Sequence, residues 1–310
     1  MSSYSTSADS YESDEPPRLQ LDLERLMGRA ADVLNADCIN AQQLTRGSNH
    51  EIFVLQFRLR PKGPAVLESL KKAGLSCIAR FTRVKDHEAR ESSEVATLRY
   101  LRRQTSIPVP EVYYEDLDPD NDVGASFVLM EKMPGRHLYK IWDDMSLEQK
   151  KSALSQVAGV VVQLASLRFD RIGCLSEDGV GPLVSPCFED PVGPFESTLQ
   201  YLQAFVATNS AIAGAELGSE IETVALNEPE IETETATKLE SYHRQKVQEE
   251  LKRFFALHTD TTYLNPPFCM IHADFDAQNM LFCHNNEERR VITWAVPGCG
   301  RLDSCSLTAH

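Results

Sequence analysis

Three polar residues near the end of the chain have the types and the spacing that phosphoryl transfer requires. His272, Asp274 and Asn279 follow the order histidine, any residue, aspartate, four residues, asparagine. The Asp274 carboxylate could accept or orient the proton of an attacking hydroxyl, and the Asn279 amide could hold a magnesium ion. Apolar runs flank the segment on both sides, as expected of a loop between two short buried strands. The pattern predicts a catalytic loop over residues 271–283, in which Asp276 is the competing carboxylate.

The composition is that of an ordinary globular protein, with 310 residues, 42% hydrophobic and 25% charged. The net charge of -15 argues against nucleic acid as a partner, because binding a phosphate backbone needs clustered lysine and arginine. No apolar run reaches the roughly 20 residues that cross a bilayer. We therefore expect neither a nucleic-acid partner nor a membrane span, and the sequence leaves the oligomeric state open.

The first 17 residues are rich in serine and acid and contain no basic residue. They indicate a disordered tail over residues 1–17 rather than a secretory signal or a mitochondrial presequence. The eight cysteines are scattered without a C-x-x-C pair, which favours reduced thiols. These features predict a cytoplasmic protein. Cysteines and histidines lie near each other around the loop, but their spacing fits no usual zinc pattern.

Strand patterns dominate the first half of the chain. Alternating apolar residues predict strands over 49–59 and 76–82, and two further strands over 111–115 and 126–131. An apolar stripe at a spacing of three predicts a helix over 87–103. Residues 18–131 therefore read as one lobe that is rich in strands.

Helix patterns dominate residues 132–294. Ser146 is a plausible N-cap with Gln149 at the capping-box position, and the predicted helix continues to Arg168 with one face made of Leu154, Val157, Ala158, Val161 and Ala165. Residues 195–207 and 237–258 are further predicted helices. Strands followed by helices favour a two-lobed α+β architecture.

An acidic stretch interrupts this second half. No lysine or arginine occurs between Arg171 and Lys238, and the small, polar part over about 209–237 is the most acidic. Its composition predicts either a disordered surface insertion or an acidic rim that attracts a cationic substrate.

Together these segments resemble the aminoglycoside phosphotransferase and choline-kinase-like family, most of all its fungal branch. The resemblance rests on the runs 268–282, 107–113 and 127–135 and extends over about residues 40–294. It implies a protein-kinase-like fold, with an antiparallel sheet and a helix in the N-lobe and a mainly helical C-lobe that is incomplete here. It also implies ATP and Mg²⁺ as cofactors and a small-molecule hydroxyl as phosphate acceptor, with cationic amines among the candidates.

The resemblance assigns nucleotide contacts in the first lobe. Arg80 corresponds to the basic residue that grips the α- and β-phosphates, and Glu94 to its partner on the following helix, although Glu88 and Glu91 lie on a similar face. The turn Gly47-Ser48 would cover the phosphates. The segment from Glu131 to Met133 would form the linker whose backbone groups bind adenine.

Two features depart from the family. Thr293 occupies the position where relatives place a magnesium-binding aspartate, and threonine is a poor ligand for that ion. Residues 295–310 are unlike the family, which continues through further helices. A second reading is therefore a pseudokinase that binds nucleotide or a partner without catalysis. A third is an incomplete product whose truncated lobe exposes apolar helix faces.

Overall fold

The protein was analysed as a computed structural model that describes residues 18–47, 49–61, 65–83, 88–185, 188, 190–205, 246, 253, 264–272, 274–284, 289–293 and 307–308. The predicted tail over residues 1–17, the acidic stretch over 209–237 and most of the atypical tail over 295–310 lie outside these residues. So does nearly all of the predicted helix over 237–258.

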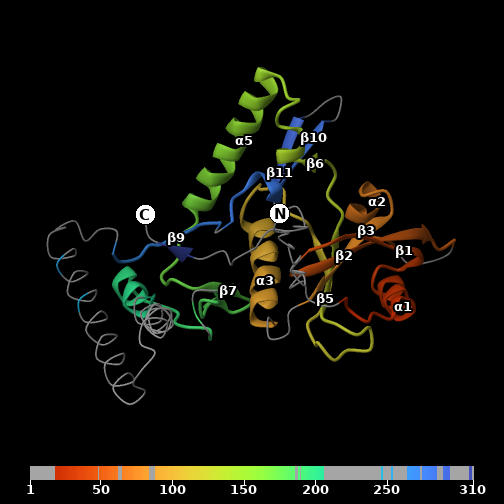
Figure 1. The fold of residues 1–310 in the computed structure, drawn as a ribbon, viewed down its shortest axis with the longest axis horizontal. Coiled ribbons are helices and arrows are strands. Elements are labelled where there is room, and N and C mark those ends of the chain that lie inside the picture. Colours follow the sequence, from red (N-terminus) through yellow and green to blue (C-terminus); the bar gives the residue numbers. More distant parts are fainter. Residues whose placement is uncertain are drawn as a thin grey trace, which may run out of the picture.

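The first lobe is a five-stranded antiparallel sheet with helices on it (Figure 1). Its strands follow the order β1-β2-β3-β5-β4. The strands are β1 (Ala36–Arg46), β2 (His50–Leu59), β3 (Ser76–Thr82), β4 (Val112–Asp116) and β5 (Phe127–Glu131). The helices are α1 (Leu23–Val33), α2 (Glu68–Lys72) and α3 (Glu88–Gln104). The strand over 76–82 is confirmed to the residue, whereas α1 and β1 had not been predicted.

The sheet is buried on both faces, which explains why all seven residues of β3 are buried. On one face, α1 packs through Leu26 and Ala30 against a cluster that includes Phe81 and Phe127. On the other face, Val95 of α3 packs against side chains from β2, β3 and β5, namely Ile52, Ile78, Val128 and Met130. Successive side chains of β3 therefore face α1 and α3 in alternation.

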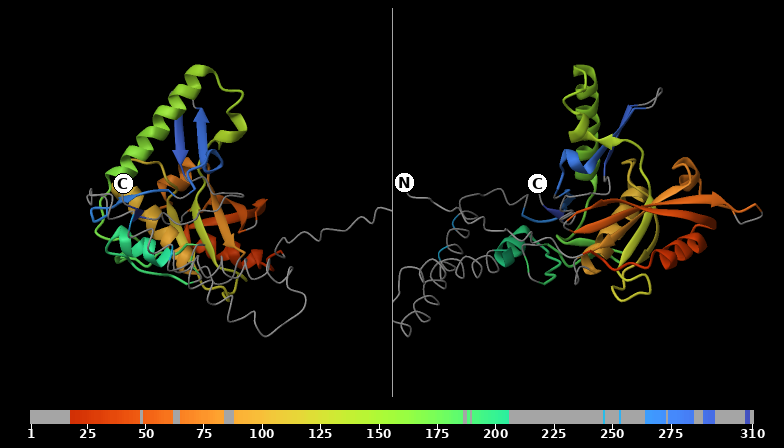
Figure 2. Two further views of the ribbon diagram at one scale, coloured as in Figure 1. Left: turned by 60° about the vertical axis from the view of Figure 1, so that its left-hand side comes forward. Right: turned by 45° about the vertical axis from the view of Figure 1, so that its right-hand side comes forward.

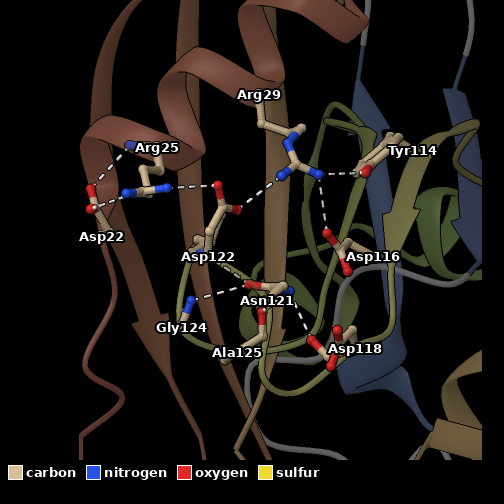
Figure 3. Close-up of polar contacts among 11 residues, drawn as sticks. Asp22, Arg25, Arg29, Tyr114, Asp116, Asp118, Asn121, Asp122, Gly124 and Ala125 are labelled. Atoms are coloured by element: carbon tan, nitrogen blue, oxygen red, sulfur yellow. Dashed lines mark hydrogen bonds and ion pairs between the residues drawn. The ribbon is translucent and has the colours of Figure 1, made fainter.

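A cluster of arginines and carboxylates ties α1 to the connection between β4 and β5 (Figure 3). Arg29 donates to the Tyr114 hydroxyl over 2.9 Å and to carboxylate oxygens of Asp116 and Asp122 over 3.2 and 2.9 Å. Arg25 donates to Asp122 over 2.9 Å. Since Arg29 is shared between three acceptors that lie far from it in sequence, this cluster fixes α1 against the edge of the lobe.

The second lobe begins with β6 (Arg136–His137) and α4 (Leu138–Ile141), followed by the long helix α5 (Leu147–Ser166). Figure 2 shows α5 projecting away from the five-stranded sheet, beside β10 (Met280–His284) and β11 (Arg289–Thr293). The remaining elements are β7 (Cys174–Ser176), β8 (Gly179–Gly181), β9 (Cys269–Met270), the 3-10 turn η2 (Ala277–Asn279) and β12 (Leu307–Thr308). Residues 198–205 are also helical.

The capping box of α5 is confirmed, since Ser146 accepts from the Gln149 backbone and the Gln149 side chain accepts from Ser146. The predicted buried face of this helix is wrong. The buried positions are Ala153, Val160 and Leu164, whereas Leu154 and Val161 are 56% and 47% exposed. The helix carries apolar residues on two faces, so its periodicity could not select the one that meets a neighbour. No helix in the described part of the chain is long and apolar enough to span a membrane.

Candidate active site

The predicted catalytic loop lies between β9 and β10 and is closed by the short turn η2. Asp276 is the N-cap of this turn, because its Oδ1 accepts from the Gln278 backbone N–H over 2.9 Å. Asp276 is exposed. The competing carboxylate is thus occupied in shaping the loop, which leaves Asp274 as the candidate for chemistry.

Asp274 is held by the amide of Asn279. The Asn279 Nδ2 donates to Asp274 Oδ2 over 2.8 Å and to the Asp274 carbonyl over 3.0 Å. Asn279 is only 2% exposed, and its Oδ1 has no hydrogen-bond partner in the described structure. A buried oxygen without a donor is unfavourable unless something else binds it. This orphaned oxygen fits a magnesium ion, which prefers oxygen ligands.

His272 orients the start of the loop. Its Nδ1 accepts from the Asp274 backbone N–H over 3.1 Å, and its ring lies 5.5 Å from the ring of Phe275. Burial lowers the pKa of His272 to about 4, against the opposing influence of the Asp274 and Glu94 carboxylates. The imidazole is therefore neutral near pH 7 and acts as a hydrogen-bond acceptor. The influence of Glu94 also shows that α3 approaches the catalytic loop.

Arg80 and Glu94 form the buried ion pair that the resemblance implies. Arg80 Nη1 donates to Glu94 Oε1, and the Arg80 side chain is 1% exposed. The Nε and Nη2 of Arg80 have no hydrogen-bond partner in the described structure. Of the three glutamates considered on this helix, Glu94 is thus the one bonded to Arg80. The two unused donors are available to an anionic ligand.

The turn after β1 is anchored by a residue that the sequence did not single out. Arg83 Nη1 donates to the Gly47 carbonyl, and the Arg83 backbone N–H donates to the Asn49 carbonyl over 2.9 Å. The Gly47 N–H in turn donates to the His50 carbonyl over 2.9 Å. Ser48 lies outside the described residues. A buried arginine directly after a predicted strand gave no sequence signal of this role.

The linker residues divide into two roles. Glu131 is engaged inside the first lobe, where its backbone N–H donates to the Glu111 carbonyl over 2.8 Å and its Oε2 accepts from the Glu111 N–H over 3.2 Å. Met133 instead packs against Leu281 and Cys283 of β10. Met133 is therefore the linker residue that meets the second lobe.

The chain that follows the linker docks beside the catalytic loop. Leu281 and Phe282 of β10 pair with His137 and Arg136 of β6. Gly135 has φ +117°, and a Cβ there would lie 2.9 Å from the Phe282 carbonyl oxygen. Glycine is needed at this position because only it combines that backbone conformation with so close an approach. The chain therefore enters the second lobe in close contact with the strand that follows the catalytic loop.

The position of Thr293 is next to the loop. In the backbone register of β10 and β11, Thr293 is opposite Met280, the residue that follows Asn279. Within the described residues no group of three or more His, Cys, Asp or Glu side chains could hold a metal ion. A magnesium ion at Asn279 would therefore depend on the phosphates of a nucleotide for further ligands.

A pocket of about 650 Å³ lies elsewhere, between α3 and the β7–β8 hairpin. Its lining includes Arg99, Tyr100 and Phe169 and contains none of the predicted site residues. We place the candidate site at the Arg80–Glu94 pair and the catalytic loop, because Arg80 and Asn279 have buried polar atoms that no described residue binds.

A two-lobed fold with an antiparallel first lobe, a buried Arg–Glu pair and this loop defines a kinase-like phosphotransferase. Residues 70–293 match the family model described as "Phosphotransferase enzyme family". Since the match covers more than half of the chain, the protein belongs to that family.

Solved structures agree with the fold. The structure of the gentamicin–APH(2")-IIa complex has a TM-score of 0.52 at 14% identity, covering 94% of this chain and 73% of that chain. The streptomycin–ATP–APH(2")-IIa ternary complex has a TM-score of 0.50 at 15% identity, with the same coverage of 94% and 73%. These likenesses confirm the kinase-like α+β fold.

Curated relatives match shorter segments. A subtelomeric hrmA-associated cluster protein of Aspergillus fumigatus is 29% identical over 138 residues, which is 44% of this chain and 25% of the relative. The protein named "Altered inheritance of mitochondria protein 9, mitochondrial" of Komagataella phaffii is 34% identical over 96 residues, 29% of this chain and 16% of the relative. The chain thus spans a quarter or less of the length of these relatives.

The cytoplasmic prediction is contradicted by this comparison, because several of the matched relatives are named as mitochondrial proteins. That prediction rested on the composition of the first 17 residues and on scattered cysteines. These two features of the sequence do not determine the compartment. The relatives named as mitochondrial are several times longer than the parts that match this chain.

Proposed function

We propose that this chain is the nucleotide-binding and catalytic part of a phosphotransferase that transfers the γ-phosphate of ATP to a hydroxyl of a small molecule. The observation that carries the proposal is the Asn279 amide, which holds Asp274 on one side and on the other has a buried oxygen that no described residue binds. Asp274 would orient the acceptor hydroxyl. Magnesium at Asn279 would neutralise phosphate charge, which is the contribution of such an ion to phosphoryl transfer.

Nucleotide binding is supported by Arg80. Its guanidinium is buried and fixed by Glu94, yet two of its nitrogens have no hydrogen-bond partner among the described residues. Buried donors of this kind suit phosphate oxygens, because charge-assisted hydrogen bonds are strong where water is excluded. The acceptor would be one that tolerates an acidic surface, and cationic amines fit the net charge of -15.

Thr293 favours slow catalysis or none. A neutral side chain at this position supplies no charge to hold magnesium, so the ion would rest on Asn279, phosphates and water. This is the observation that favours the second candidate function, a pseudokinase that binds nucleotide without transferring phosphate. We infer also that the protein acts in mitochondria, as the names of several relatives suggest. Cell fractionation with an antibody against this chain would test that location.

Nucleotide binding is tested by thermal unfolding with and without millimolar ATP and MgCl₂. ATP should raise the melting temperature, because a ligand that binds only the native state stabilises it by mass action. Arg80→Ala should abolish the rise. Arg58→Ala is the matched control, since that arginine is 71% exposed and lies on the outer part of β2. If ATP does not change the melting temperature of the parent protein, the first lobe does not bind nucleotide as proposed.

Catalysis is tested by ATP turnover against magnesium concentration. We expect turnover to be very slow in the parent, and Thr293→Asp to raise it by supplying the missing carboxylate. In that background Asp274→Asn should lower the rate by about 10²-fold or more, whereas Asp276→Asn should act only through the stability of the loop. Robust turnover in the parent would show that the inactivity expected from Thr293 is wrong.

A further inference from the structure

A second glutamate is buried beside the Arg80–Glu94 pair. Glu91 is one helical turn before Glu94 on α3 and only 2% exposed. Neither of its carboxylate oxygens has a hydrogen bond of ordinary geometry within the described structure, and the nearby Ser126 side chain offsets only part of the effect of burial on its pKa. A carboxylate is rarely buried in this way without a partner. Its position therefore calls for an explanation that the Arg80–Glu94 pair alone does not provide.

The strand register shows what Glu91 faces. Arg80 lies in a cross-strand row with Ile52 and Val128, and this row packs under Val95 of α3. The next row pairs His50 with Thr82. Glu91 precedes Val95 by one turn, and its Oε1 lies 4.0 Å from His50 Nε2. Glu91 thus sits over the His50–Thr82 row, on the same face of the sheet as Arg80.

Arg80 by itself does not neutralise the two carboxylates beside it. Arg80 contributes one positive charge, and Glu91 and Glu94 together contribute two negative charges when both are ionised. The two unused donors of Arg80 and the buried, unpartnered hydroxyl of Thr82 lie on the same face. The other titratable or charged groups around Glu91 are His50 on β2 and Arg90 on α3. The local charge beside Arg80 therefore depends on whether Glu91 carries its proton.

We propose that Glu91 is a positioning residue for the nucleotide, a second carboxylate whose protonation sets how strongly Arg80 holds phosphate. This inference rests on the proposed function, since it assumes that Arg80 binds nucleotide phosphates. A phosphate group brought to Arg80 is repelled by an ionised Glu91 and not by a neutral one. Nucleotide binding therefore draws a proton onto Glu91, and affinity falls as Glu91 ionises.

The midpoint of this effect is near neutrality. Burial raises the pKa of Glu91 to about 7, opposed by the positive charge of Arg80 and assisted by the negative charge of Glu94. If bound phosphate raises this pKa by about one further unit, affinity drops about fivefold between pH 6 and pH 8. If protonation of Glu91 strengthens nucleotide binding, then nucleotide binding must also favour protonation of Glu91. Binding near pH 7 therefore takes up a fraction of a proton.

The experiment is calorimetric titration of the full chain with ADP at pH 6, 7 and 8, in buffers of different ionisation enthalpy. ADP titrates in this range itself, so the quantity compared is the difference between variants. The fall in ADP affinity between pH 6 and pH 8 should be about fivefold smaller in Glu91→Gln than in the parent. The variant should also lack the proton uptake that exceeds that of ADP itself. Glu88→Gln is the matched control, an exposed glutamate in the first turn of the same helix. It should leave both quantities as in the parent.

Each outcome decides the proposal. Equal pH dependence in the parent and in a folded Glu91→Gln variant overturns it, as does loss of the pH dependence in His50→Gln with its retention in Glu91→Gln. If Glu91→Gln does not fold, the parent alone decides, because proton uptake no greater than that of ADP itself excludes a titrating Glu91. Absence of ADP binding at every pH overturns the proposed function as well, whereas binding without the predicted linkage overturns only the role of Glu91.

Discussion

At the scale of single residues, the candidate site is marked by polar atoms that the protein itself leaves unsatisfied. Asn279 Oδ1 and two nitrogens of Arg80 are buried without partners in the described structure. Such atoms cost free energy of folding unless a ligand binds them. Asn279 had been chosen from the sequence by type and spacing and Arg80 through the family resemblance, and the burial of both adds a physical reason to expect a ligand there.

His272 gives the site a dependence on pH that can be measured through stability. Its pKa of about 4 in the folded protein is below the usual value of about 6.5. Between these values the unfolded chain binds more protons, so stability rises with pH across this window. The contribution of His272 is present above about pH 6.5 and is lost as the pH falls towards 4.

We expect His272→Gln to weaken this dependence by about 2 kcal/mol between pH 4.5 and pH 7, as measured by urea unfolding. Glu91 acts in the opposite direction, because its raised pKa means that its stabilising contribution is lost as the pH rises through about 7. Subtracting the parent curve from the variant curve isolates His272. Parallel curves for the two proteins would contradict a neutral, buried imidazole.

At the scale of elements, the hairpin of β1 and β2 depends on a buried ion pair behind its turn. Arg83 Nε lies 3.7 Å from Glu51 Oε1, and their side chains are 1% and 4% exposed. Glu51 also accepts from the Leu19 N–H and from Gln43 Nε2, each over 3.2 Å. Because Arg83 also donates to the Gly47 carbonyl, one side chain connects the turn to the body of the lobe.

Arg83→Met should therefore destabilise the protein by about 3 kcal/mol, since it leaves the buried Glu51 carboxylate without one of its cationic partners. Arg58→Met on the exposed part of β2 is the matched control, because its 3.7 Å ion pair with Asp37 is largely exposed. Its effect should be below about 1 kcal/mol. Equal effects of the two changes in equilibrium unfolding would show that the turn is not anchored by Arg83.

At the scale of the whole molecule, α5 carries an exposed apolar stripe that no described residue covers. Leu147, Leu154 and Val161, spaced seven residues apart, are 66%, 56% and 47% exposed, and Val162 is 64% exposed. The neighbouring face of the helix packs against the rest of the lobe through Ala153, Val160 and Leu164. Exposed apolar patches on a helix promote association.

We expect the chain to associate with increasing concentration, and Leu154→Lys combined with Val161→Lys to reduce this association in sedimentation velocity. The melting temperature should change little, because neither side chain is in the core. Ala153→Lys is the contrasting control on the buried face, and it should lower the melting temperature strongly. A monomeric parent at all concentrations would contradict the role of the exposed stripe.

Patterns of residues close together in the chain were enough to predict the loop over 271–283, the strand of Arg80 and the capping of α5. Hydrogen bonds between Asp274 and Asn279 span five residues, and the strand over 76–82 is apolar throughout most of its length. Local patterns of this kind are visible before folding.

Contacts between residues far apart in the sequence select which side chains hold the loop, the strand of Arg80 and the helix α5 in place. Glu94 was distinguished from Glu91 and Glu88 by the crossing of α3 over β3, and Arg83 was placed behind the Gly47 turn by the pairing of β2 with β3. The buried face of α5 was chosen by its neighbours rather than by its own period. In each case the spacing of residues along the chain was compatible with several arrangements. A contact with a residue distant in sequence selected one of them.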